Sequence, residues 1–212
     1  MHGTQTLEIL LRCLSNIDEE VLLSGCCALY ALIQRSPPAR LLFLRKNGVA
    51  ELGECLRDYN TGIKGTSLQI VCALASENEP AREEMRQEEL LLCVLRTIQS
   101  FPAEDVTLGV LDAALEAVAH IVTNSPANQE YLRMQGGIDP LVDALRYAID
   151  RIAVGQGGPT HDVESDAVVD AIWMGGDRPG VDLLKVTETA CFALSNVVYH
   201  CSENQAAALE LG

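Results

Sequence analysis

The chain has 212 residues, of which 48% are hydrophobic and only 4% aromatic, and its formal net charge is −15. This composition predicts helices packed through Leu, Val and Ala, and no apolar run approaches the roughly 20 residues that a membrane-spanning helix needs. Direct nucleic-acid binding is excluded as a function, because phosphate contacts draw on clustered Lys and Arg side chains. Acidic residues instead outnumber basic ones by 30 to 15.

The N-terminus and the cysteines bear on the location of the protein. The segment Met1 to Thr4 lacks the basic and apolar parts of a secretion signal, so we expect a cytoplasmic protein, with nuclear or cytoskeleton-associated placement as alternatives. The eight cysteines fall within predicted helices and show no C-x-x-C spacing. We therefore expect reduced, buried thiols and no zinc site.

A helical pattern recurs along the chain. Pro-Ala pairs at 38–39, 80–81 and 126–127 lie 42 and then 46 residues apart, within the period of roughly 40 to 47 residues of helical solenoid repeats. Near each pair runs an apolar stripe with the i, i+3, i+4, i+7 spacing of an amphipathic helix, and the first members of the stripes are separated by 42, 42 and 47 residues. The stripes are Leu7, Leu10, Leu11 and Leu14; Val49, Leu52, Gly53 and Leu56; Leu91, Val94, Leu95 and Ile98; and Ile138, Leu141, Val142 and Leu145.

Each unit divides into three predicted helices. The first begins at the proline, where Ser36 or Ser125 serves as the N-cap, and ends at Gly48 or at Gly136-Gly137. The second carries the apolar stripe. The third is predicted over Glu20–Gln34, Thr61–Ser76, Ala103–Asn124 and Val181–Cys201. The chain is thus predicted as a single array over 1–212, with a partial repeat at 1–36, repeats at 37–78, 79–124 and 125–201, and the start of a further repeat at 202–212.

One unit is about 30 residues too long, which predicts an insertion at about 153–180, bounded by Gly-rich and Pro-rich segments. Its centre combines acids with an apolar group, namely Asp162, Glu164, Asp166 and Asp170 with Val168, Val169, Ile172 and Trp173. Either this segment docks on the solenoid or on a partner through Trp173, or it is a solvated acidic loop. The acids lack the spacing of a calcium-binding loop, so we predict no metal site.

Two segments resemble a known family. Gly137-Ile138-Asp139-Pro140-Leu141-Val142 is similar to the Gly-x-x-Pro-x-Leu/Val start of the second helix of armadillo repeats, and Ala193-Leu194-Ser195-Asn196-Val197 resembles part of their third helix. HEAT repeats, whose length overlaps, are the alternative. The armadillo resemblance, shared with β-catenin-like and importin-α-like solenoids, implies a right-handed all-α solenoid of about four three-helix repeats with one long inserted loop. Its third helices would line a concave groove for an extended peptide or a protein.

The resemblance also indicates which residues a partner would meet. In importin-α-like members a Trp, and an Asn four residues later, recur along the groove. Aligned on the Pro-Ala pairs, the Asn positions are Leu32, Leu74, His120 and Asn196, and the Trp positions are Ala28, Ile70, Glu116 and Phe192. This pattern departs from that of a nuclear-import-type receptor except in the last repeat. Ala28, Leu32, Ile70 and Leu74 either form an apolar strip of the groove or pack into the core.

The remaining groove candidates are mostly acidic or aromatic. The partner-binding residues predicted here are Asp112, Glu116, His120, Glu188, Phe192, Asn196, Tyr199 and Trp173. An acidic groove favours a basic peptide or protein surface through electrostatic steering, although the acidity could equally serve only solubility.

Catalytic motifs are absent from the sequence. Gly155-Gln156-Gly157-Gly158 has no following Lys-Ser/Thr, no Gly-x-Ser-x-Gly motif occurs, and the four histidines lie in separate units. We therefore predict a non-enzymatic scaffold or adaptor without cofactor, which binds a protein or an extended, possibly basic, peptide. The alternative is a structural subunit of a cytoskeletal or ciliary assembly that associates end to end through uncapped terminal repeats.

Overall fold

The computed structural model describes residues 2–57, 60–76, 78–102, 106–155 and 183–211. This part of the chain is all helical and contains no strand. Its helices are α1 (His2–Leu14), α2 (Glu19–Arg35), α3 (Pro37–Arg45), α4 (Gly48–Arg57), α5 (Thr61–Ala75), α6 (Glu79–Gln87), α7 (Leu90–Gln99), α8 (Leu108–Val122), α9 (Pro126–Met134), α10 (Ile138–Gly155), α12 (Leu183–Val198) and α13 (Ser202–Glu210).

The helices begin at polar capping residues. Ser36 Oγ accepts a hydrogen bond from Ala39 N at 3.3 Å, and Asn78 Oδ1 accepts one from Ala81 N at 3.3 Å, which satisfies backbone donors that have no partner within the helix. Ser125 is the N-cap residue of α9 but makes no such side-chain bond, so that part of the capping prediction is wrong.

The first and second helices of a unit are joined through one residue in the left-handed conformation. These residues are Asn47, Glu89 and Gly136, with φ of 60°, 58° and 67°. The prediction that Gly48 makes this turn is wrong, because Gly48 is already the first residue of α4. A Cβ on Gly48 would lie 2.4 Å from the Phe43 ring, so the glycine permits close packing instead.

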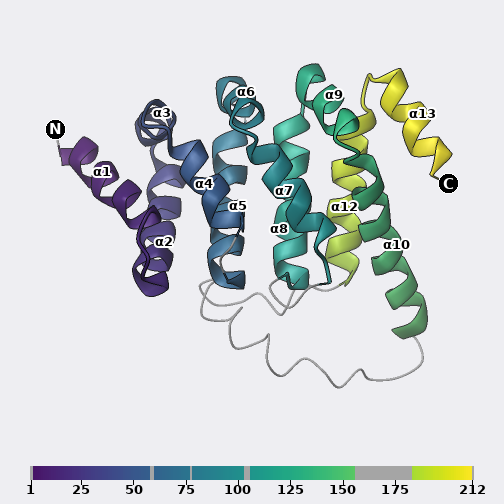
Figure 1. The fold of residues 1–212 in the computed structure, drawn as a ribbon. Helices are drawn as coiled ribbons and strands as arrows, with labels where there is room; N and C mark the ends of the chain where they lie inside the picture. The colour runs from purple at the N-terminus through teal and green to yellow at the C-terminus, as the bar shows by residue number, and fades with distance from the viewer. Residues whose placement is uncertain (1, 58–59, 77, 103–105, 156–182, 212) are drawn as a thin grey trace.

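Helices of one kind stack in rows (Figure 1). The third helices α2, α5, α8 and α12 lie side by side, each packed against the next, and the second helices α1, α4, α7 and α10 form a neighbouring row. The short helices α3, α6, α9 and α13 run along one edge. Three of the four third helices end within three residues of their predicted bounds at both ends, whereas α8 begins at Leu108, five residues after the predicted start.

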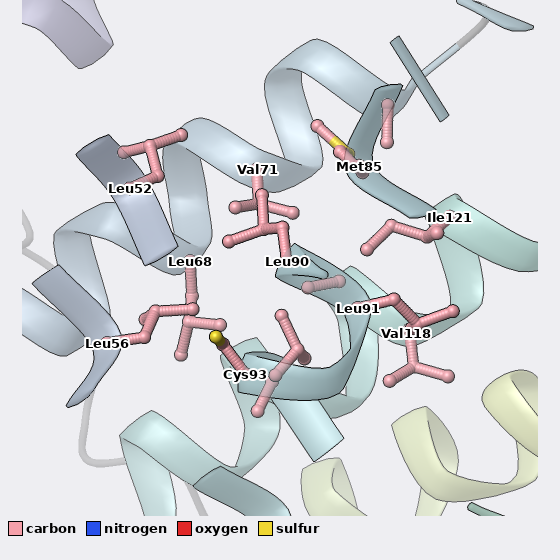
Figure 2. Close-up of a cluster of buried hydrophobic side chains, with 14 of the residues drawn as sticks. Leu52, Leu56, Leu68, Val71, Met85, Leu90, Leu91, Cys93, Val118 and Ile121 are labelled. Atoms are coloured by element: carbon pink, nitrogen blue, oxygen red, sulfur yellow. The ribbon is translucent and has the colours of Figure 1, made fainter. Parts of the chain in front are cut away.

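A continuous hydrophobic core fills the space between the rows. Figure 2 shows its middle, where Leu52 and Leu56 of α4 face Leu68 and Val71 of α5, and side chains from α6, α7 and α8 complete the cluster. The predicted stripe residues of α4 and α7 are all buried, and those of α1 and α10 are buried or half-buried. Burying one Leu side chain contributes roughly 1.5–3 kcal/mol, so these rows dominate the stability of the array.

Asparagine side chains link successive units. Asn128 Nδ2, in the first turn of α9, donates to Ile121 O at 2.9 Å and to Arg82 O at 3.1 Å. Asn204 Nδ2 repeats this pattern one unit later, at 2.8 Å to Val197 O and 3.3 Å to Gln129 O. Each amide thus joins the end of a third helix to the first helix of the preceding unit.

The structure also bears on the predicted insertion and on the predicted buried cysteines. Helix α10 continues to Gly155, past the predicted start of the insertion at 153, and residues 156–182 lie outside the described part of the chain. All eight cysteines are free, but the prediction that they are buried holds only for Cys26, Cys55 and Cys93, because Cys27 and Cys191 are exposed and the other three are half-buried. No helix in the described ranges combines the length and the apolar character needed to cross a membrane.

Candidate functional site

The exposed surface of α2, α5, α8 and α12, here called the third-helix face, carries two hollows. The larger, of about 570 Å³, spans three helices. It is lined by Cys27, Tyr30, Gln34, Thr66, Gln69, Cys72, Ala73, Ser76, Ala113, Glu116 and His120. The second, of about 400 Å³, is lined by Glu116, Lys185, Glu188, Thr189 and Phe192. Because Glu116 lines both hollows, they form one depression across four helices.

The register of this face differs from the predicted one in the first two units. Of the four apolar residues considered for the groove, Ile70 and Leu74 are fully buried and belong to the core, Leu32 is half-buried and Ala28 is exposed, so they do not form a continuous apolar strip. The cause is the alignment on proline: Pro80 is the second residue of α6, whereas Pro126 is the first residue of α9. A shift of one residue rotates a side chain by about 100° around a helix.

The residues of each third helix that lie on the surface are found by counting back from the N-cap residue of the helix that follows. Nine residues before Ser36, Asn78, Ser125 and Cys201 lie Cys27, Gln69, Glu116 and Phe192. Five residues before them lie Ala31, Ala73, His120 and Asn196. All eight are exposed or half-buried. The apolar stripes predict the correct register, because the first members of the last two stripes are 47 residues apart. Pro80 and Pro126 are only 46 residues apart, so alignment on the prolines gives a register that is wrong by one residue.

Asp112 does not face the surface, contrary to its prediction as a binding residue. Its side chain is 4% exposed and accepts a hydrogen bond of 2.6 Å from Thr189 Oγ1, across the contact between α8 and α12. Buried carboxylates require such partners. Asp112 therefore holds two third helices together and is unavailable to a ligand.

Glu116, His120 and Phe192 form a cluster where the two hollows meet. The Oε1 atom of Glu116 lies 3.8 Å from Nε2 of His120, and the ring centroids of His120 and Phe192 are 6.4 Å apart at an interplanar angle of 78°. Phe192 is 47% exposed. The cluster thus presents a carboxylate beside an aromatic ring, an arrangement that suits a cationic side chain.

Glu188 lies on α12 and lines the smaller hollow, whereas Tyr199 follows the last residue of α12 and lines neither hollow. Glu188 is exposed, and its Oε2 atom lies 3.8 Å from Lys185 Nζ. Tyr199 is exposed near the end of the helix, and its ring is tilted against that of His200. The predicted binding residues Glu116, His120, Glu188 and Phe192 thus come together around one depression.

Asn196 has a structural role as well as a place on this face. Its Nδ2 atom donates to Ala119 O at 3.4 Å, and its backbone carbonyl oxygen accepts a hydrogen bond of 2.7 Å from Gln129 Nε2. The amide therefore contributes to the packing of α12 on α8. Trp173 lies outside the described residues.

Two thiols in the larger hollow have altered acidity. Burial raises the pKa of the Cys72 thiol well above its ordinary value, and the Glu116 and Asp112 carboxylates raise it further. Burial also raises the pKa of Cys27, although a hydrogen bond with Thr66 opposes the shift. Thiols of raised pKa are poor nucleophiles at neutral pH. Within the described ranges, no group of three or more His, Cys, Asp or Glu side chains is arranged to hold a metal ion.

The described helices define a class: an all-α solenoid built from stacked three-helix units, hollowed along its row of third helices. Solved structures with this arrangement are armadillo repeat proteins. Computationally designed armadillo repeat proteins for modular peptide recognition superimpose with a TM-score of 0.70 at 15% identity, over 97% of this chain and 70% of theirs. The chain has the armadillo-repeat fold.

Natural and ligand-bound structures are similar too. The armadillo repeats only protein of Plasmodium falciparum matches with a TM-score of 0.62 at 14% identity, over 89% of this chain and 67% of that one. A designed armadillo repeat protein in complex with the peptide (KR)4 matches with a TM-score of 0.60 at 16% identity, over 97% and 87%. No family model and no curated protein sequence matches the chain.

Proposed function

We propose that this protein is a non-enzymatic scaffold that binds an extended, basic segment of a partner protein on its third-helix face. The observation that carries the proposal is the depression formed by the two hollows that meet at Glu116. An extended ligand needs a continuous track over several units, and this depression crosses four helices.

Charge and chemistry support a basic ligand. The exposed carboxylates of Glu116 and Glu188 flank the half-exposed ring of Phe192, and the chain as a whole has a net charge of −15. Such a field steers cationic segments toward the surface and favours their complementary docking. A designed protein of the same fold is in complex with the alternating basic peptide (KR)4, which makes this peptide a suitable first probe.

Binding of fluorescein-labelled (KR)4, followed by fluorescence anisotropy, tests the proposal. In the double variant Glu116→Gln/Glu188→Gln we expect the Kd to rise about tenfold, since each exposed ion pair contributes roughly 0.7 kcal/mol. The Kd of the parent protein should also rise with salt concentration, because screening weakens attraction between exposed charges. Phe192→Ala should weaken binding further through loss of the aromatic contact.

The matched control is Glu79→Gln/Glu88→Gln, which removes the same charge from the exposed first-helix edge at α6. It should leave the Kd within about twofold of the parent value. Equal effects of the two double variants would show that only net charge matters. That result, or the failure of (KR)4 to bind at all, would overturn the proposal of a basic ligand on this face.

A structural subunit that associates end to end is the second candidate. Ile17, between α1 and α2, is 98% exposed, and Leu209 of α13, at the opposite end of the array, is 81% exposed. Apolar residues at both ends could meet in a head-to-tail contact. Light scattering over a hundredfold concentration range tests this candidate, and a constant monomer mass would rule it out.

We further propose a cytoplasmic location, with nuclear or cytoskeleton-associated placement as the alternatives. Its eight cysteines are all free, two of them on the surface, and exposed thiols persist in reducing compartments. Localisation of a fluorescent fusion tests this placement.

A further inference from the structure

Another hollow lies between α7 and α10, away from the third-helix face. Its volume is about 420 Å³. Helix α10 has 18 residues, against 10 in each of the preceding second helices α4 and α7, so it extends beyond them (Figure 1). The hollow occupies the angle between the end of α7 and this longer helix.

The floor of the hollow is apolar and one end of it is aromatic. Ile98, Pro140 and Ala144 are buried beneath it. Phe101 and Tyr147 close one end, with ring centroids 4.9 Å apart in an edge-to-face arrangement at 84°. Both rings are only half-buried, so part of their surface is open to a ligand.

Charged residues follow α10 along this hollow and past its end. Asp139, Asp143, Tyr147 and Arg151 succeed one another at intervals of four residues, so each is turned about 40° from the one before and the four form a shallow spiral. The first three line the hollow, and Arg151 lies one turn beyond Tyr147. Asp139 is exposed in the first turn of the helix. The Arg151 guanidinium lies 5.4 Å from the Tyr147 ring centroid. The stripe therefore changes from acidic through aromatic to basic.

The carboxylates of Asp139 and Asp143 are accessible to a ligand. Among the described residues Asp139 forms no ion pair, and Asp143 lies 3.8 Å from Arg146 but keeps 74% of its side chain exposed. Arg146 donates its Nη2 group to the carbonyl oxygen of Leu211, which holds it on the side of α13. An incoming cation can therefore approach both carboxylates.

The spacing of the stripe matches an extended chain. Residues four apart in α10 are separated by about 6 Å along the helix axis, and alternate residues of an extended peptide are about 6.6 Å apart. We propose that the α7–α10 hollow binds an extended segment of a partner protein. In this segment two cationic residues at alternate positions meet Asp139 and Asp143, a proline or other apolar residue packs against Phe101 and Tyr147, and an acidic residue lies beside Arg151.

This site is separate from the proposed basic-peptide site, because its lining comes from second helices and not from the third-helix face. The protein thus holds two segments at once, from one partner or from two. The order of charges distinguishes their ligands: the α7–α10 hollow selects a segment that ends in an acid, which a uniformly basic peptide lacks.

The test uses two fluorescein-labelled peptides, Arg-Ala-Arg-Ala-Pro-Ala-Glu and its twin ending in Lys, titrated with the full chain. The Glu peptide should bind several-fold more tightly than its twin. In Asp139→Asn/Asp143→Asn the Kd of the Glu peptide should rise about tenfold, from the loss of two exposed ion pairs. In Arg151→Glu the preference between the two peptides should reverse.

The substituted residues are exposed, so their loss does not endanger folding, and Glu79→Gln/Glu88→Gln again serves as the control. If Asp139→Asn/Asp143→Asn leaves the Kd unchanged, or if Arg151→Glu does not alter the preference, the inference is wrong. A response to Glu116→Gln/Glu188→Gln alone would place the peptide on the third-helix face. That outcome would overturn this second site and leave the proposed function intact.

Discussion

Asn128 illustrates how single residues set the geometry of the array. It is fully buried, and its Nδ2 atom bonds two carbonyl oxygens, one at the end of α8 and one in α6. Its sequence neighbours do not reveal this role, since the acceptor in Arg82 lies 46 residues away. The same holds for Asp112, whose partner Thr189 is 77 residues distant. Acidic character alone therefore misplaced Asp112 on the surface.

Replacing Asn128 with Ala should lower the free energy of unfolding by about 2 kcal/mol, because two buried carbonyl groups lose a donor. Urea denaturation followed by circular dichroism measures this. Gln135→Ala, at an exposed position just after α9, is the control and should change stability by less than about 0.5 kcal/mol. Equal stabilities of the two variants would contradict the linking role of Asn128.

The thiols offer a second test at the residue scale. Cys72 has a raised pKa from burial and nearby carboxylates, whereas Cys191 is exposed. Because the thiolate is the reactive form, iodoacetamide at pH 8 should modify Cys191 at least about tenfold faster than Cys72. Peptide mapping by mass spectrometry gives both rates. Comparable rates would mean that the larger hollow does not shield Cys72.

At the scale of elements, the helices and their buried stripes followed from periodicity, because packing requires apolar residues at helical spacing. Leu52 and Leu91 in neighbouring second helices are examples. Periodicity did not predict which residues of the third helices face outward, because the alignment rested on Pro80 and Pro126, which occupy different positions in the first turns of α6 and α9. A proline is tolerated at either position, so it marks where a helix begins without fixing which residues face outward.

Two glycines within third helices should respond in opposite ways to substitution by Ala. A Cβ at Gly25 of α2 would lie 2.4 Å from Cys13 Cβ, whereas a Cβ at Gly65 of α5 would have a Val110 methyl group as its nearest neighbour, 4.0 Å away. Gly25→Ala should destabilise by about 1–3 kcal/mol through overpacking of α1 on α2. Gly65→Ala should stabilise by about 0.5–1 kcal/mol, because Ala favours the helix.

Thermal unfolding of both glycine variants against the parent protein checks this pair. The shifts in Tm should have opposite signs. If both variants lost stability, the open space beside Gly65 would not be available to a methyl group, and the packing of α5 on α8 would be tighter than described.

At the scale of the whole molecule, acidity affects stability as well as the proposed recognition of a basic segment. The pKa values of Glu8, Glu83 and Glu130 are lowered by hydrogen bonds with Lys46, Arg86 and Arg133 respectively. A carboxyl group whose pKa is lowered by folding stabilises the folded state above its unfolded pKa and loses this contribution as the pH falls through the folded value. Glu84, whose pKa is raised by burial, acts in the opposite direction.

Stability should therefore decline as the pH falls below about 4.5, the ordinary pKa of Glu, because the glutamates with a lowered pKa, which also include Glu203, outnumber Glu84 with its raised pKa. Urea midpoints at pH 7, 5, 4 and 3 measure the effect. Glu84→Gln should raise the midpoint at pH 7, since it removes the cost of a partly buried charge. A midpoint that rises between pH 4 and pH 3 would show that relief of acidic repulsion prevails over these ion pairs.

The amide links between units have a consequence for how such an array varies. Asn128 and Asn204 bond to backbone carbonyl oxygens, which every amino acid supplies. The joint between units therefore places no demand on the side chain at the accepting position. Recognition residues can diversify from one unit to the next while the pitch of the solenoid is inherited unchanged, which agrees with a shared fold at 14–16% identity.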